Sequence, residues 1–440
     1  MTSGRIDIIT MGCSKNLVDS ERLMRRLEAK GYEMHHDSDR VSGEVVVVNT
    51  CGFIGDAKEE SINMILELVE AKQRGEIGRL MVMGCLSERY LSELKAEIEE
   101  VDAWYGKFNW DAIVDSLPDI SERVPELKPW ERKLTTPPFS TYIKVSEGCN
   151  RMCAYCAIPL ITGRHKSRTV ESILDEVTAL AADGVREFNV IAQDLSAYGT
   201  DLADGRSLLA ELIDRMADIP GVRWIRLHYA YPVDFPWDVL EVMRRRDNVC
   251  NYLDIALQHI STPVLDAMRR HVNKEQTLQL IDRIRREVPG ICLRTTLMTG
   301  FPGEGEAEFK ELVDFVKSVR FDRLGVFAYS EEEGTYAARH LDDNIPQEVK
   351  EARRDEIQEL HEHIALEKNK ALIGSRVEVL VETEDEGELL ARTQWDSPEV
   401  DHQVHIALPA DGYGKQIKPG DFVTVEITDA LPYDLYAELL

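Results

Sequence analysis

The sequence predicts an α/β fold in three parts. These are a parallel α/β domain over residues 1–124, a partial (β/α)6 barrel over 139–370, and a small antiparallel β-barrel over 371–440. Apolar strand-like runs alternate with amphipathic helical runs through the first two parts, the pattern of parallel sheets with right-handed crossovers. Residues 124–138 are rich in proline and charge and predict a linker between these parts. From residue 371 onward the segments instead become short and alternate between apolar and polar residues, as in antiparallel strands.

The first part reads as a βαβαβ unit. Because parallel neighbours need helical crossovers between them, this order predicts a parallel sheet with the strand ends aligned along one edge. Its predicted strands are 5–10, 43–51 and 79–85, and its predicted helices are 16–32 and 58–75.

The second part repeats the strand–helix rhythm six times. Six units predict an open or partial barrel rather than a closed eightfold one, with chemistry in the loops that follow the strands. A long helix over 345–374 leads out of the barrel. The predicted strands are 140–146, 186–194, 224–232, 252–259, 291–300 and 323–330.

The third part predicts strands at 375–384, 402–409 and 421–430, and it concentrates negative charge. Residues 371–440 contain 15 acidic and 4 basic residues. The whole chain of 440 residues carries a net charge of −28, which disfavours an extended phosphate-binding surface. It favours a basic partner instead.

The N-terminal sequence has no signal-peptide pattern, and no apolar run approaches the length of a membrane span. We therefore expect a cytoplasmic protein with no membrane contact. Its eight cysteines should then stay reduced, and clustered cysteines point to metal or redox chemistry.

The stretch SEGCNRMCAYCAIP contains Cys149, Cys153 and Cys156 directly after the first predicted barrel strand. Three interpretations are open. A structural zinc ion would need a fourth ligand, for which His165 is available. Inert core cysteines are improbable in a loop. An iron–sulfur cluster normally takes four cysteines, so three leave one iron open for a substrate or cofactor.

Three further cysteines share one context. Cys13, Cys51 and Cys85 lie in MGCS, NTCG and MGCL, each just past an apolar strand and beside a glycine. Because parallel strands end along one edge of their sheet, these thiols are predicted to converge as a second three-cysteine site. Cys250 and Cys292 lack this context, and we interpret them as core residues or as incidental.

The spacing C-x3-C-x2-C, with Tyr155 before the last cysteine, resembles the radical S-adenosylmethionine (SAM) superfamily. The resemblance implies that Cys149, Cys153 and Cys156 hold a 4Fe–4S cluster whose open iron is chelated by SAM. The cofactor would then yield a 5′-deoxyadenosyl radical that abstracts a hydrogen atom. Tyr155 is expected beside the cluster. Gln193, in the NVIAQD segment, is expected to contact SAM.

With the second cysteine group included, the whole chain resembles the methylthiotransferases, which join an N-terminal three-cysteine domain, a radical SAM barrel and a small TRAM barrel. The resemblance implies that Cys13, Cys51 and Cys85 hold a second 4Fe–4S cluster that handles sulfur. It also implies two SAM molecules, an external electron donor and a sulfur donor. The reaction converts C–H into C–S–CH3.

The family has two branches. One modifies an adenosine of tRNA, and the other modifies the β-carbon of an aspartate in the twelfth protein of the small ribosomal subunit. The segments TMGCSKNLVDSE and YSEEEGT resemble the second branch, and the acidic third part disfavours direct RNA binding. Three alternatives remain: a tRNA adenosine methylthiotransferase, a non-catalytic zinc-stabilised adaptor for basic ribosomal proteins, and an iron–sulfur carrier.

Overall fold

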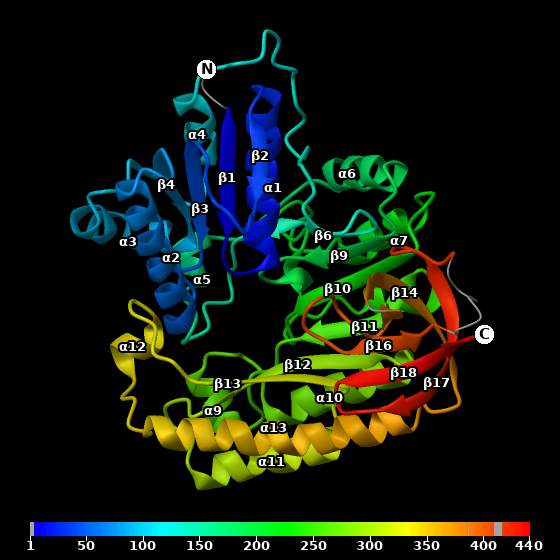
Figure 1. The fold of residues 1–440 in the computed structure, drawn as a ribbon. Coiled ribbons are helices and arrows are strands. Elements are labelled where there is room, and N and C mark those ends of the chain that lie inside the picture. The colour runs from blue at the N-terminus through cyan, green and yellow to red at the C-terminus, as the bar shows by residue number, and fades with distance from the viewer. Residues whose placement is uncertain (1–3, 386, 409–415) are drawn as a thin grey trace.

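A computed structural model describes residues 4–385, 387–408 and 416–440. Figure 1 shows three bodies, with the N-terminal domain in blue, a central sheet from green to yellow, and a C-terminal barrel from orange to red. The predicted α/β class with a small barrel at its end is confirmed.

The N-terminal domain contains a parallel sheet in the order β2-β1-β3-β4-β5. The three predicted strands are all present. Two further strands were not predicted because each is very short and only partly apolar. The elements are β1 (Arg5–Thr10), α1 (Ser14–Ala29), β2 (Glu33–His36), β3 (Val45–Thr50), α2 (Gly55–Gln73), β4 (Arg79–Gly84), α3 (Cys85–Glu97), β5 (Ala103–Trp104) and α4 (Trp110–Ser116).

The composition of the central strand β3 explains why this sheet forms. Every residue of β3, VVVVNT, is buried, and β-branched side chains suit a strand that is covered on both faces. Helix α1 covers one face with Leu23, Met24 and Leu27, each fully buried. Each such side chain contributes roughly 1.5–3 kcal/mol by leaving water.

The central body is a six-stranded parallel sheet in the order β13-β12-β11-β10-β9-β6. All six predicted strands are present, and β6 and β13 form its two edges, so the partial barrel is confirmed. The strands are β6 (Ser140–Lys144), β9 (Glu187–Ile191), β10 (Trp224–Ala230), β11 (Val249–Ile255), β12 (Cys292–Thr299) and β13 (Arg323–Ala328).

Helices connect these strands, and a two-stranded ribbon follows β6. The ribbon pairs β7 (Ser146–Glu147) with β8 (Lys166–Ser167) in antiparallel fashion. The helices are α5 (Ile158–Thr162), α6 (Val170–Ala182), η1 (Leu195–Ala197), α7 (Leu209–Ala217), α8 (Asp238–Arg245), α9 (Thr262–Ala267), α10 (Lys274–Glu287), α11 (Glu306–Val319), α12 (Tyr336–His340) and α13 (Gln347–Lys370).

The C-terminal body is a closed barrel in the order β14-β15-β16-β18-β17. The prediction of a purely antiparallel barrel needs one correction, because β16 pairs with β18 in parallel. The chain passes through β17 between these two strands, and the β17–β18 hairpin brings β18 back in the direction of β16. The strands are β14 (Arg376–Asp385), β15 (Glu388–Thr393), β16 (Gln403–Ala407), β17 (Phe422–Ala430) and β18 (Asp434–Leu439). Residue 409, the last of the predicted strand 402–409, lies outside the described residues.

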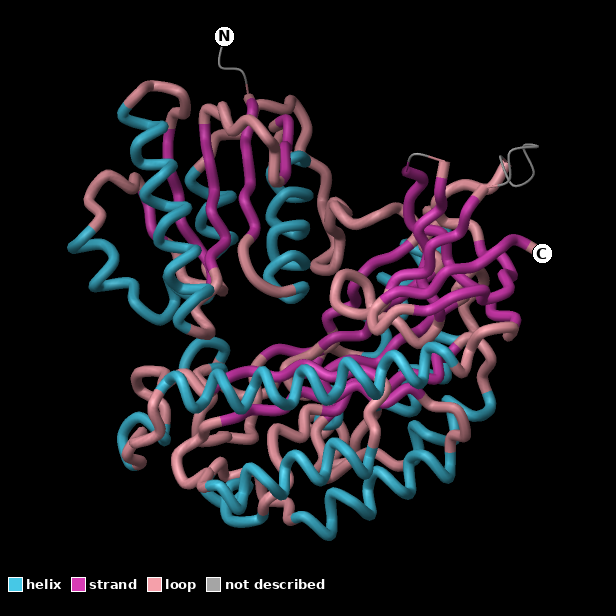
Figure 2. The backbone as a smooth tube through the Cα atoms, turned by 60° about the horizontal axis from the view of Figure 1, so that its bottom comes forward, coloured by secondary structure: helices cyan, strands magenta, loops and turns pink. Residues whose placement is uncertain are grey.

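The predicted linker is a structural part of the interface between the first two bodies. Arg132 is 8% exposed and donates to Glu21 of α1 at 2.5 Å and to Glu176 of α6 at 2.8 Å. It also donates to the carbonyl oxygen of Tyr142 at 2.6 Å. Because a buried ion pair is costly to break, this segment fixes how the N-terminal domain sits on the sheet (Figure 2).

A second buried group joins the sheet to the C-terminal barrel. Glu187 of β9 accepts from Arg226 at 2.8 Å and from Arg392 of β15 at 2.5 Å, and all three side chains are buried. The two guanidinium groups outweigh burial and hold the pKa of Glu187 well below its usual range.

Within the described ranges, the structure contains no helix that is both long and apolar enough to span a bilayer.

Candidate active site

The first cysteine group lies in the loop after β6 and β7. The backbone NH of Cys149 donates to the Gly163 carbonyl at 3.2 Å, and that of Cys156 donates to the Cys153 carbonyl at 3.1 Å, which folds the loop into a compact turn. Burial raises the pKa of Cys149 to about 11 and raises that of Cys156 further. The neighbouring Cys153 thiol adds to the rise for Cys156. Thiolates at these positions therefore need a compensating positive charge, which a metal cluster would provide.

Arg270 is a site residue that sequence reasoning missed. Its guanidinium is 2% exposed and donates to Cys153 Sγ at 3.3 Å and to the Tyr155 hydroxyl at 3.3 Å. The Tyr231 hydroxyl lies 3.7 Å from the same sulfur. No local motif marks Arg270, since it reaches the loop only through the folded sheet.

Tyr155 lies beside the cysteines, where the sequence placed it. Its ring packs edge-on against Phe301 with a centroid distance of 6.3 Å.

Gln193 follows β9 and faces the same region. Its amide donates to Glu147 at 3.1 Å, while its Oε1 is buried and has no hydrogen-bond partner among the described residues. That oxygen is available to accept from a ligand amine. The next residue, Asp194, instead pairs with Arg151 at 2.6 Å.

The MTGFPGE turn after β12 has a structural role at helix α13. A Cβ at Gly300 would lie 2.1 Å from Lys350 Cγ, so glycine admits helix α13. The Glu304 carboxylate accepts from the Gly300 NH at 2.9 Å and from Arg353 at 2.9 Å.

The second cysteine group converges as predicted, at the C-terminal ends of β1, β3 and β4. Gly12 has φ +93°, and a Cβ there would lie 2.8 Å from Cys51 Cβ, so glycine permits the approach of the first two loops. Cys13 and Cys51 are also close enough to Cys85 to help raise its pKa to about 12, although burial is the larger cause. The Cys85 thiol donates to Asn16 Oδ1 at 3.5 Å.

Charged side chains connect the second cysteine group to the segment that precedes the first. Lys107 Nζ donates to Asn16 at 3.3 Å and to Asp19 at 2.8 Å. Asp19 also pairs with Lys144 of β6, and Lys144 pairs with Glu147. The chain of contacts therefore runs from the second cysteine group, across the domain interface, to the residue that holds Gln193.

The zinc alternative is not supported by side-chain placement. His165 Nε2 lies 2.9 Å from the Ser167 hydroxyl. Throughout the described ranges, no three His, Cys, Asp or Glu side chains are placed to hold a single ion. Cys250 and Cys292 are buried core residues, as expected.

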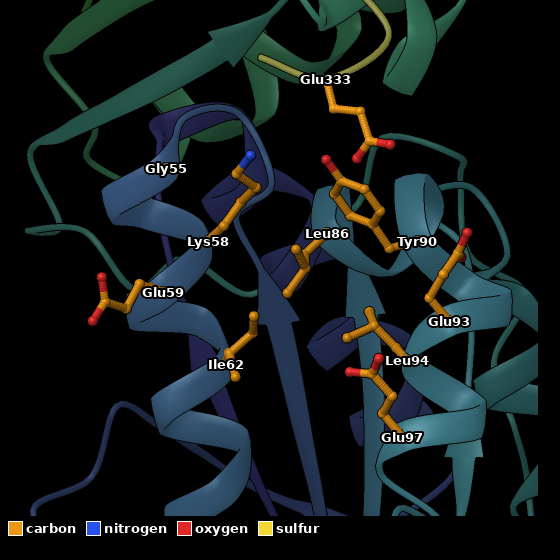
Figure 3. Close-up of a pocket in the computed structure, with 10 residues that line it drawn as sticks. All are labelled: Gly55, Lys58, Glu59, Ile62, Leu86, Tyr90, Glu93, Leu94, Glu97 and Glu333. Carbon is orange, nitrogen blue, oxygen red and sulfur yellow. The ribbon is translucent and has the colours of Figure 1, made fainter. Parts of the chain in front are cut away.

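A groove of about 420 Å³ lies between α2 and α3 (Figure 3). Leu86, the residue after Cys85, contributes to its apolar lining together with Ile62 and Leu94. Four glutamates also line it, namely Glu59, Glu93, Glu97 and Glu333. Glu333 belongs to the central body and the other three glutamates to the N-terminal domain, and because Lys58 is the one cation among the lining residues the groove is acidic on balance.

Three family models match the chain. Residues 5–106 match the "Uncharacterized protein family UPF0004", 143–316 match the "Radical SAM superfamily", and 373–440 match the "TRAM domain". Among solved structures, the radical S-adenosylmethionine methyltransferase TsrM from Kitasatospora setae aligns with a TM-score of 0.55 and 16% identity. That alignment covers 94% of this chain and 83% of TsrM, and it shows similarity of fold.

Curated relatives are similar over the full length. The ribosomal protein uS12 methylthiotransferase RimO of Bacteroides thetaiotaomicron is 56% identical over 100% of this chain and 99% of its own. Its counterpart from Parabacteroides distasonis is 54% identical over 100% of both chains. With the radical SAM barrel and TRAM domain in place, the chain belongs to the RimO family of radical SAM methylthiotransferases.

Proposed function

We propose that the chain transfers a methylthio group to the β-carbon of an aspartate in ribosomal protein uS12, converting C–H into C–S–CH3. The observation that carries the proposal is the pair of three-cysteine groups, with a chain of contacts that runs from Cys85 to Glu147, two residues before Cys149. The full-length similarity to proteins named for this activity supports the substrate.

Each cysteine group is assigned one 4Fe–4S cluster. Cys149, Cys153 and Cys156 would hold the cluster that binds and cleaves SAM, and Cys13, Cys51 and Cys85 would hold the cluster that handles sulfur. When bound, these groups supply reductive SAM cleavage, the radical and the transferred sulfur, with two SAM molecules, an external electron donor and a sulfur donor.

The protein's own residues then have definite tasks. Arg270 donates to Cys153 Sγ and stabilises negative charge on the sulfur. Tyr155 fills the space beside the loop against Phe301. Gln193 presents its Oε1, which has no hydrogen-bond partner among the described residues, to the amino group of SAM. Domain boundaries at 1–124, 139–370 and 371–440 would separate sulfur handling, radical generation and substrate docking.

Charge supports a basic protein substrate. The net charge is −28, the C-terminal barrel is strongly acidic, and the groove between α2 and α3 carries four glutamates. These surfaces attract a basic ribosomal protein and repel tRNA, in keeping with a cytoplasmic enzyme that makes no direct contact with RNA or membrane.

The test is anaerobic incubation of the reconstituted enzyme with SAM, sulfide and reductant. Purified uS12 and unmodified tRNA are offered in parallel, and product masses are measured. We expect a methylthio mass gain on uS12 alone. A gain on tRNA alone would overturn the proposal.

A further inference from the structure

A small pocket of about 140 Å³ lies where the N-terminal domain meets the β7–β8 ribbon. Arg22 of α1 lines it from one body, and Lys144, Ser146, Lys166 and Arg168 line it from the other. The pocket is therefore formed only when the two bodies are assembled.

The cations of this pocket are not all neutralised. Lys144 pairs with Asp19, and Arg168 pairs with Glu176 at 2.6 Å. The side chains of Arg22 and Lys166 make no hydrogen bond or ion pair with any residue in the part of the chain that the structure describes. Burial and the neighbouring Arg168 guanidinium lower the pKa of Arg22. Glu176 and Asp19 act in the opposite direction, but neither carboxylate forms a hydrogen bond or ion pair with this half-buried arginine.

Ser146 provides an independent indication of a ligand. The residue is 1% exposed, and its hydroxyl has no hydrogen-bond partner among the described residues although it lines the pocket. Buried hydroxyls are almost always hydrogen-bonded, so an unpartnered one beside an unpaired guanidinium indicates a missing acceptor. A guanidinium fork and a hydroxyl together suit a carboxylate.

The size and position of the pocket further restrict which groups could bind in it. A water molecule takes roughly 30 Å³ of liquid volume, so the pocket has room for a carboxylate and one or two methylene groups, but not for a nucleotide. Glu147, which accepts from Gln193, lines the same pocket. The bound group would therefore lie next to both the SAM-facing residue and the charge chain that leads to Asn16 and Cys85.

We propose that this pocket binds the side-chain carboxylate of the target aspartate, with Arg22 as its charged partner and Ser146 as a second donor. The inference rests on the proposed function. It adds a reason for aspartate specificity: the carboxylate is held at the domain junction, and the adjacent β-carbon is presented toward the space between the cysteine groups.

The experiment compares wild type, Arg22→Gln and Ser146→Ala on two forms of uS12, one with the target aspartate and one with asparagine in its place. Wild type should bind the aspartate form about 10- to 100-fold more tightly, the range of a charge-assisted hydrogen bond. Arg22→Gln should remove that preference and leave affinity for the asparagine form unchanged. Ser146→Ala should reduce the preference by a smaller factor, and Arg22→Lys should restore part of it.

Arg25→Gln is the matched control. Arg25 lies on the same helix but pairs with Glu28 at 3.5 Å and Glu131 at 3.6 Å, away from the pocket, so its loss should leave the preference intact. Iron content and SAM affinity without uS12 are measured for every variant. An unchanged aspartate preference in Arg22→Gln overturns the inference. Weakened SAM binding without uS12 also overturns it, because the carboxylate bound would then be that of SAM.

The two proposals fail in different ways. If wild type adds no methylthio group to uS12, the proposed function fails. If wild type modifies uS12 and Arg22→Gln does so with the wild-type preference, only the pocket assignment fails.

Discussion

Replacing Asp19 by asparagine tests the charge chain between the cysteine groups. Asp19 is 5% exposed and accepts from Lys107 at 2.8 Å and from Lys144. Burial favours its neutral acid, but the Lys107 and Lys144 ammonium groups outweigh burial and hold the pKa of Asp19 well below its usual range. The substitution keeps the shape of the side chain and removes only its charge.

The expected loss of folding free energy follows from the interactions that Lys107 and Lys144 keep in the variant. Lys144 keeps its pair with Glu147, whereas the hydrogen bond that Lys107 keeps is to the neutral Asn16 oxygen at 3.3 Å. Removing one partner of a buried ion pair costs about 3–5 kcal/mol, and because one lysine stays paired we expect about 3 kcal/mol. The difference in stability between wild type and Asp19→Asn should have its full size at neutral pH. It should shrink below about pH 4, where the unfolded wild-type carboxyl takes up a proton that the folded one does not.

Amide hydrogen exchange is the suitable assay, because a chain of three bodies need not unfold in one step. Exchange through opening of α1 should accelerate by roughly two orders of magnitude, the equivalent of about 3 kcal/mol. Asp115→Asn, on an exposed turn of α4, is the control and should change nothing. Exchange rates in Asp19→Asn within threefold of wild type would refute the reasoning.

Three other predictions concern different parts of the molecule. Cys153→Ala should abolish 5′-deoxyadenosine formation, whereas Cys51→Ala should retain SAM cleavage and block methylthiolation; normal methylthiolation by Cys51→Ala would contradict the assigned roles. Glu187→Gln should leave two buried arginines underneutralised and destabilise the junction of sheet and C-terminal barrel by about 3 kcal/mol. Proteolysis near residue 371 should be faster in this variant, unlike in the exposed control Glu384→Gln. Burial lowers the pKa of His361 to about 4, so the unfolded chain protonates first as pH falls from about 6.5. Wild type should therefore lose about 2 kcal/mol more than His361→Gln between pH 7 and pH 5 in urea unfolding, and equal losses would contradict this.

The apolar strands were predictable because their burial leaves a continuous or alternating pattern in the sequence. All six strands of the central sheet and the three main strands of the first domain follow this rule. The sequence did not predict β2 and β5 because these strands are short. It did not predict β15 and β18 because these strands are recognised by their pairing with neighbouring strands rather than by a pattern in their own residues. The parallel β16–β18 pair depends on closure of the barrel, which no local pattern records.

The cysteines of the candidate site were predictable for a similar reason. Strand ends in a parallel sheet share one edge, so residues far apart in sequence converge by topology alone. Arg270, Arg22 and Lys107 follow no such rule. Each is an ordinary charged residue in its own segment, and its role appears only when two elements, or two bodies, pack together.

The Arg132 bridge limits how this architecture tolerates recombination. Glu21 lies in the N-terminal domain, Arg132 in the connecting segment and Glu176 in the central body. A chimaeric gene joined between residues 124 and 138 can therefore combine Arg132 with a residue at position 21 that is not acidic. Such a hybrid would bury an unpaired guanidinium unless the donor supplied an acid at the position of Glu21. The segment that looks most suitable for a crossover is therefore among the least exchangeable parts of the chain, and parts taken from relatives should be swapped with Glu21, Arg132 and Glu176 together.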